Sequence, residues 1–262
     1  MLSLVKAVEF IMPMKNGRTG PALLLCERDD GSDVAVVTKF TSGCEQAGIN
    51  LARETIGACL ASDLSLPIPE AFRVTLSEEF IASVPNDLFQ AKMEASSEFA
   101  FGSKHITGQY NLWNSGYSVV RNMLPVAASI FAFDGIIQNP DRRVANPNCL
   151  VKGDDVRIFD HELAFSNGLV IGWVAPWKPG GLHSLEDPAM HIFKAGLSGK
   201  NIDLTDVRSR WAALSDVNIS TYGDAIPEQW NATDTIAAAT RLIKEARDNI
   251  DGCVTELERV LG

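Results

Sequence analysis

One segment of the chain, residues 139–165, reads "NPDRRVANPNCLVKGDDVRIFDHELAF". Its first ten residues are poor in apolar side chains although apolar runs lie on both sides, so this segment serves something other than packing. Asp141 is followed five residues later by Asn146, and Asp160 comes after two short apolar runs that the turn "GDD" separates. The pattern predicts a polar loop followed by a β-hairpin, with a second acid at the end of the hairpin.

These residue types at these spacings suit phosphoryl transfer, which needs a positioned nucleophile, metal ions that bridge the phosphates, and cations. In the spacing Asp-x-x-x-x-Asn, Asp141 would orient or deprotonate the acceptor hydroxyl, and the amide oxygen of Asn146 would hold Mg²⁺. Asp160 would complete the metal site, because hard oxygen ligands suit Mg²⁺. Asn148, directly before the strand "CLV", is an alternative ligand, and the spacing favours Asn146.

The first third of the chain is predicted to hold three antiparallel strands and one helix. Turn signals at residues 15–20 ("KNGRTG") and 29–32 ("DDGS") separate three short apolar runs. Residues 49–66 then repeat apolar side chains at helical spacing and stop at "PIP", where the chain must become extended. Residues 73–83, "RVTLSEEFIAS", are a candidate for further strand.

Two residues in this part fit a phosphate site. Lys39 ends the third apolar run, "VAVVTKF", as a phosphate-pairing lysine does in a kinase, and Glu54 on the following helix is the acid predicted to hold it. Glu45 is nearer in sequence but precedes the helical pattern. The turn at 15–20 offers Gly17 and Gly20, whose backbone N–H groups are candidates to cover phosphates.

The remainder of the chain is predicted to be mostly helical. Residues 116–138, "GYSVVRNMLPVAASIFAFDGIIQ", indicate a buried helix or a helix pair interrupted around Pro125. The last 31 residues, from 232, predict two helices that separate at Gly252. The chain is therefore assigned to the α+β class, with a two-lobed protein-kinase-like fold: a first lobe over residues 1–98 and a larger helical lobe over 99–262.

Composition narrows the possible functions. The chain has 262 residues, 46% of them hydrophobic, and a net charge of -10, which argues against a broad nucleic-acid surface while leaving a local basic patch possible. Five scattered cysteines without CxxC spacing predict free thiols. No transmembrane run, signal-peptide pattern or polybasic helix is present, so the sequence predicts a cytoplasmic protein without membrane contact.

The motifs together resemble the HipA-like kinases, in the small form that lacks the extra N-terminal subdomain of the full-length toxins. The Asp-Arg-Arg-x-x-Asn run is also similar to the Asp-Arg-His-x-x-Asn of phosphoinositide kinases, which share the atypical kinase fold. Arg143 stands where HipA proteins usually carry a histidine. The segments that carry the resemblance span most of the chain: "VVTKF", "LARETIGACLASDLSLPIPE", "FAFGSKHI", "FDGIIQNPDRRVANPNCLV", "RIFDHELAF", "HIFKAGLSGK" and "IPEQW".

The resemblance implies that ATP and Mg²⁺ bind between the lobes, with the site residues in the roles argued above. It also implies that adenine contacts the backbone of the connector around Glu98, Phe99, Ala100 and Phe101.

The sequence predicts an ATP- and Mg²⁺-dependent kinase that transfers the γ-phosphoryl group to a hydroxyl, that of Ser or Thr in a protein. One alternative is a nucleotide-binding pseudokinase that acts as an interaction or regulatory module with a partner protein. Another is a lipid or small-molecule kinase, which the phosphoinositide-like "DRR" suggests. The cluster "DHE" at 160–162 also resembles part of a metal-hydrolase site, but no second His-rich motif accompanies it.

Overall fold

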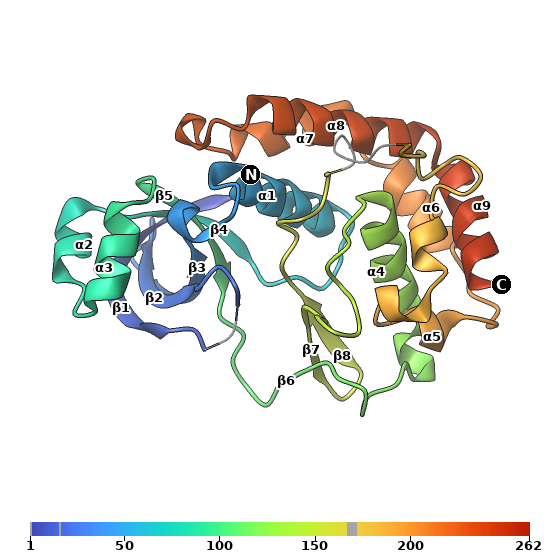
Figure 1. Cartoon of the computed structure of the whole chain (residues 1–262), viewed down its shortest axis with the longest axis horizontal. Coiled ribbons are helices and arrows are strands. Elements are labelled where there is room, and N and C mark those ends of the chain that lie inside the picture. Colours follow the sequence, from blue (N-terminus) through green and yellow to red (C-terminus); the bar gives the residue numbers. More distant parts are fainter. Residues whose placement is uncertain (1, 16, 167–171) are drawn as a thin grey trace.

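The computed structural model describes residues 2–15, 17–166 and 172–262. Its first part is a closed five-stranded barrel in the order β1-β2-β3-β5-β4 (Figure 1). Alternate side chains of these strands, such as Val5, Leu24 and Phe72, point into the barrel and are fully buried. The strands are β1 Ser3–Pro13, β2 Ala22–Arg28, β3 Asp33–Lys39, β4 Ala71–Thr75 and β5 Phe99–Lys104.

Closure of the barrel depends on the long strand β1. It pairs with β2 in antiparallel fashion along its length, and its residues 3–6 pair in parallel with residues 72–75 of β4. Two register shifts, between Ala7 and Glu9 and between Phe10 and Met12, bend β1. The predicted antiparallel sheet is therefore corrected to a closed barrel with one parallel pair.

Helix α1 (Gly48–Asp63) lies between the barrel and the helical part (Figure 1). It contacts β4 and β5 on one side and α7 and α8 on the other. Thirteen of its sixteen residues are buried, which explains a sequence that is apolar or small almost all round. The helix ends at Asp63, three residues before the predicted end at residue 66, and Ser65, with a φ of +54°, turns the chain ahead of "PIP".

Two short helices that the sequence analysis did not predict follow β4. Ser77 caps the first turn of α2 (Glu78–Ser83) by accepting a hydrogen bond from Phe80 N, and Asn86 caps α3 (Asp87–Glu94) by accepting one from Phe89 N. The strand predicted within residues 73–83 is thus confirmed only at its start, and the described residues of the first part form three α-helices rather than one.

The helical part is built around α4 (Leu124–Ile136), whose later residues are all buried. Pro125 lies in its first turn, where no N–H is needed, so it begins this helix instead of interrupting it. The helical part also holds a small sheet of β6 (Asn111–Leu112), β7 (Cys149–Lys152) and β8 (Asp155–Ile158), the last two forming the predicted hairpin.

The remaining helices are α5 (Lys194–Leu197), α6 (Thr205–Ala212), α7 (Asp216–Asp224), α8 (Thr233–Asp248) and α9 (Ile250–Leu261). The last two separate at Asn249, not at the predicted Gly252. Gly252 lies inside α9, where a Cβ would stand 2.7 Å from Trp177 O, so its small size serves packing and not a break.

The buried residues form two cores. One fills the barrel, and the other joins the helical part to α1, including Leu51, Ile56 and Leu60. β5 is hydrogen-bonded into the barrel, whereas the boundary predicted after residue 98 separates it from the first part. All five cysteines are free thiols. None of the helices in the described residues has the length and hydrophobicity needed to cross a membrane.

Candidate nucleotide and metal site

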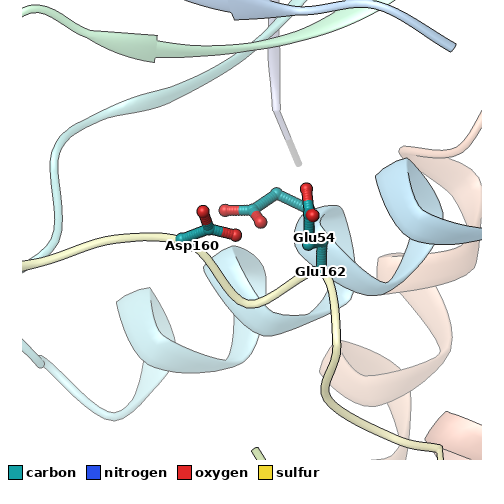
Figure 2. Close-up of side chains that lie close together, drawn as sticks. All are labelled: Glu54, Asp160 and Glu162. Carbon is teal, nitrogen blue, oxygen red and sulfur yellow. The ribbon is translucent and has the colours of Figure 1, made fainter. Parts of the chain in front are cut away.

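Lys39, the last residue of β3, places its ammonium group among three carboxylates. Its Nζ lies 3.1 Å from Glu54 Oε2, 2.8 Å from Asp160 Oδ1 and 3.0 Å from Glu162 Oε2. Figure 2 shows these three acids turned toward one another, Glu54 from α1 and the other two from the segment after β8. Residues separated by more than 100 positions thus meet at one point between the barrel and the helical part.

The backbone after β8 brings both acids to Lys39. β8 ends at Ile158, and Asp160 has the left-handed φ of +66°, which turns the chain. Asp160 therefore follows the end of the hairpin, and the turn lets both Asp160 and Glu162 reach Lys39. The backbone of Glu162 is fixed to α1, because Asn50 Nδ2 donates to Glu162 O at 3.1 Å.

The cluster carries an excess of negative charge. Burial alone would lower the pKa of Lys39, but the charges of Asp160, Glu54 and Glu162 raise that pKa well above its usual value. Burial would raise the pKa of Glu54, and the charge of Lys39 holds it well below its usual range. For Glu162, burial and the neighbouring carboxylates raise the pKa. One ammonium for three carboxylates leaves a site that favours an added cation.

The loop at residues 139–148 places Asn148, not Asn146, against Asp141. Asn148 is buried, and its Nδ2 donates to Asp141 Oδ2 at 3.2 Å and to Asp141 O at 3.1 Å. Asn146 is exposed, and its backbone N–H donates to Arg143 O. Arg143 is itself exposed, with Nη2 3.5 Å from Asp141 Oδ1. The spacing favoured Asn146, whereas the side chain that contacts Asp141 is that of Asn148.

A buried network that the sequence analysis missed holds this loop. Arg142, with no exposed surface, donates from Nε to Asp134 Oδ2 of α4 at 2.6 Å. Asn139 Nδ2 and His191 Nε2 reach the same carboxylate, at 2.7 and 3.1 Å. Burial would raise the pKa of Asp134, but the positive charge of Arg142 holds it well below its usual range. The sequence signal that could have indicated this network was Arg142 itself, an arginine directly after the predicted Asp141.

The same arginine ties the loop to the acid cluster. Arg142 Nη1 donates to Asn148 O and, at 3.1 Å, to Phe159 O, and Phe159 N donates to Asn148 O at 3.2 Å. The residue before Asp160 is therefore bonded to the residue that contacts Asp141. Asp141 and Asp160 lie on two segments that are held together by buried hydrogen bonds.

The glycine turn between β1 and β2 is anchored to α3. Lys92 Nζ donates to Gly20 O at 2.6 Å and also contacts Thr19 O, while Gly20 N donates to Gly17 O at 3.0 Å. Both glycines have positive φ, +116° and +55°, which suits a residue without a side chain. Asn16 of this turn lies outside the described residues. The role of Gly17 and Gly20 in covering phosphates stays a prediction.

Phe99, Ala100 and Phe101 belong to β5, and Glu98 directly precedes it, so this segment is not a free connector. Phe101 is paired with Lys39 of β3 on one side and with Arg73 of β4 on the other. Trp230 Nε1 donates to Phe99 O at 3.1 Å, and the side chain of Glu98 accepts from Gln229. The backbone groups of this segment are therefore engaged in the barrel and at the edge of the helical part, which leaves little there for adenine.

Comparison with known proteins adds to this geometry. The sequence profile of the HipA-like kinases matches residues 7–258. The chain belongs to the HipA-like kinase family.

Among solved structures, the HipA-like chain is similar to the Helicobacter pylori proinflammatory kinase CtkA, with a TM-score of 0.54, 13% sequence identity, and coverage of 96% of each chain. This likeness shows a shared fold. A comparison with curated protein sequences gave no significant match. The resemblance seen in the sequence is confirmed, and membership of a kinase family implies ATP and a divalent metal, for which the acidic triad offers ligands.

Proposed function

We propose that this HipA-like kinase binds ATP with Mg²⁺ and transfers the γ-phosphoryl group to the hydroxyl of Ser or Thr in a protein. The observation that supports this best is the meeting of Lys39, Glu54 and Asp160 beside a loop whose Asp141 is held by a buried amide. Phosphoryl transfer depends on positioning and on balanced charge, and these residues provide both.

Each residue has a role that follows from its contacts. Lys39 would pair the α- and β-phosphates while Glu54, which is almost fully buried, keeps the ammonium in place. Asp141 would accept the proton of the acceptor hydroxyl or orient it. Its carboxylate is half-buried, so it is open to an acceptor while Asn148 fixes its direction.

The residues around Asp160 fit a divalent metal, because they offer carboxylate and amide oxygens and a local excess of negative charge. We propose Asp160 and Asn148 as ligands, with Glu162 as the third ligand. Asn148 is preferred to Asn146 because it is buried and bonded to both Asp141 and the backbone next to Asp160. When bound, Mg²⁺ would neutralise charge on the phosphates.

Adenine would bind along residues 105–110, the connector that follows β5. The support for this position is that β5 pairs on both edges, whereas the chain after Lys104 leaves the barrel and leads toward β6 (Figure 1). His105 N still donates to Ala35 O, which fixes the start of the connector beside β3.

Phosphate transfer from ATP labelled at the γ position tests the proposal. The protein is incubated with Mg²⁺, a protein mixture and lipid vesicles, and the labelled products are separated and hydrolysed to phosphoamino acids. Label on Ser or Thr that disappears in Asp141→Asn and persists in the exposed control Asp154→Asn is the expected result. Label in the lipid or small-molecule fraction, or binding of ATP without transfer, would contradict protein phosphorylation and support one of the alternatives.

A further inference from the structure

His161 lies between the buried Arg142 network and the Lys39 cluster. Its side chain is 2% exposed. Arg142 Nη2 lies 3.2 Å from Nε2 of the ring, and Glu54 Oε1 lies 3.7 Å from Nδ1. The two sets of charges described above are therefore separated by a single imidazole.

The contact with Arg142 decides which ring nitrogen carries the proton. A guanidinium group only donates hydrogen bonds, so His161 Nε2 must accept. In the neutral ring the proton then stands on Nδ1. Among the described residues this Nδ1 has no hydrogen-bond partner, although it is buried. The ring thus presents an unused donor to Glu54.

Glu54 is bonded to the same residue in a second way. The backbone N–H of His161 donates to Glu54 Oε2 at 2.7 Å, and that oxygen also lies 3.1 Å from Lys39 Nζ. Oε1, the other oxygen of Glu54, is the one that faces the ring. A buried carboxylate that loses part of its ammonium partner needs another donor.

Packing fixes the ring in this orientation. A Cβ on Gly57 of α1 would lie 2.7 Å from His161 Cβ and 3.1 Å from Cγ, so only glycine leaves room there. On its other side the ring makes an edge-to-face contact with Phe133 of α4, with ring centroids 5.5 Å apart. The imidazole therefore contacts α1, α4 and, through Arg142, the loop at residues 139–148, which we call the catalytic loop.

We infer that His161 is a positioning residue that couples the catalytic loop to the Lys39–Glu54 pair, its Nε2 accepting from Arg142 and its Nδ1–H held ready for Glu54. The inference rests on the proposed function in one respect, that Lys39 turns toward nucleotide phosphates. When Lys39 turns toward the phosphates, Glu54 still accepts a hydrogen bond from the backbone N–H of His161. It then also accepts one from the Nδ1–H of the ring.

Two substitutions test the contact of His161 with Arg142 and its contact with Glu54 separately. His161→Asn puts an amide N–H near the position of Nδ1 and removes the acceptor for Arg142, whereas His161→Gln puts an amide oxygen near Nε2 and removes the donor to Glu54. We expect His161→Gln to weaken Mg²⁺–ATP binding about tenfold or more, the effect of one lost hydrogen bond to a charged group. His161→Asn is expected to keep nucleotide affinity within about threefold and to lower kcat instead.

The exposed His183→Gln is the matched control and should change neither quantity. Equal effects of the two His161 variants on affinity and on kcat, or a fall in the unfolding midpoint with no such split, would overturn the coupling and leave a packing role.

A second measurement is independent of nucleotide. The ¹⁵N chemical shifts of the imidazole nitrogens, assigned among the four histidines by comparison with a His161 variant, report the tautomer in the free protein. We expect the proton on Nδ1. A proton on Nε2 would overturn the inference. If the wild type carries the proton on Nδ1 but binds no Mg²⁺–ATP, the proposed function is contradicted. The contacts that link Arg142, His161 and Glu54 would still be supported.

Discussion

Two buried ionic groups lie on either side of His161, and they differ in charge balance. Around Asp134, one carboxylate meets one guanidinium, and two neutral side chains complete its hydrogen bonds. Around Lys39, one ammonium meets three carboxylates. The Asp134 group is almost fully buried, whereas 23% of the Asp160 side chain is exposed.

We therefore assign the two groups different roles: the Asp134 group fixes the structure of the loop, and the Lys39 cluster binds ligands. A balanced, fully bonded pair stabilises one arrangement of the loop because every partner is needed. An unbalanced cluster costs stability in the free protein, and we interpret this excess charge as the attraction for a metal and its nucleotide. Substitutions in the first group should therefore affect unfolding, and those in the second should affect binding and turnover.

The largest expected effect lies on the chemical side. Asp141→Asn should lower phosphoryl transfer by about 10²- to 10⁴-fold, the usual contribution of a general base. Nucleotide affinity and the unfolding midpoint should stay close to those of the wild type, because Asn148 still finds a carbonyl oxygen at residue 141. Steady-state kinetics with labelled ATP measure this, and unchanged turnover would show that Asp141 does not engage the acceptor.

On the architectural side, Asp134→Asn should lower the free energy of unfolding by about 3–5 kcal/mol, since it leaves the Arg142 charge buried without a counter-ion. Urea unfolding followed by tryptophan fluorescence provides the value. Asp154→Asn, an exposed acid of the β7–β8 turn, is the matched control with no expected change. A loss below about 1 kcal/mol, the range of a surface pair, would remove the distinction between the two groups.

The balanced group also predicts how stability depends on pH. Burial lowers the pKa of His191, and Arg142 keeps the pKa of Asp134 low despite its burial. In both cases the unfolded chain binds the proton more readily, so stability is present above the unfolded pKa and is lost as pH falls. Below about pH 6.5 the free energy of unfolding should fall with pH, and the slope from His191 is at most about 1.4 kcal/mol per pH unit.

His191→Gln keeps an N–H for Asp134 without a titrating ring. Its free energy of unfolding, measured by urea titration between pH 5 and 7, should be flatter than that of the wild type. Parallel curves for the two proteins would mean that His191 does not carry this dependence.

The smallest expected effect is a gain in the free energy of unfolding, opposite in sign to the loss expected for Asp134→Asn. Burial and neighbouring acids raise the pKa of Glu162, so its ionised form opposes folding at neutral pH. Glu162→Gln should therefore raise the free energy of unfolding of the free protein by about 1 kcal/mol, while weakening Mg²⁺-dependent nucleotide binding. Calorimetric unfolding with and without Mg²⁺–ATP measures both. Destabilisation of the free protein would show that Glu162 is mainly a structural partner of Lys39.

The sequence predicted Lys39 and Asp160 because each ends an apolar run, and Asp141 because of its spacing from Asn146. It predicted Glu54 because this acid lies on the helix that follows Lys39. The order of strands, helix and hairpin followed from the same periodicity. These are local signals, and they were sufficient for the fold class and for most of the charged residues at the site.

The features that the sequence did not predict depend on contacts between distant segments. Closure of the barrel requires the parallel pairing of β1 with β4, which no local pattern marks. The preference for Asn148 comes from burial against Asp141, and Arg142 is identified only once Asp134 is found beside it. The cap at Ser77 was readable in principle, but the β-branched residues before it favoured strand.

The most direct test of the account is the thermal unfolding midpoint with ATP, with and without Mg²⁺, in the wild type, Asp160→Ala and the control Asp154→Ala. Ligand at about 100 times Kd adds about 2.7 kcal/mol, which corresponds to several degrees for a chain of this size. We expect a Mg²⁺-dependent rise that Asp154→Ala keeps and Asp160→Ala loses. No rise in the folded wild type at millimolar nucleotide would contradict a nucleotide site at Lys39, and an equal rise in Asp160→Ala would contradict its role in holding the metal.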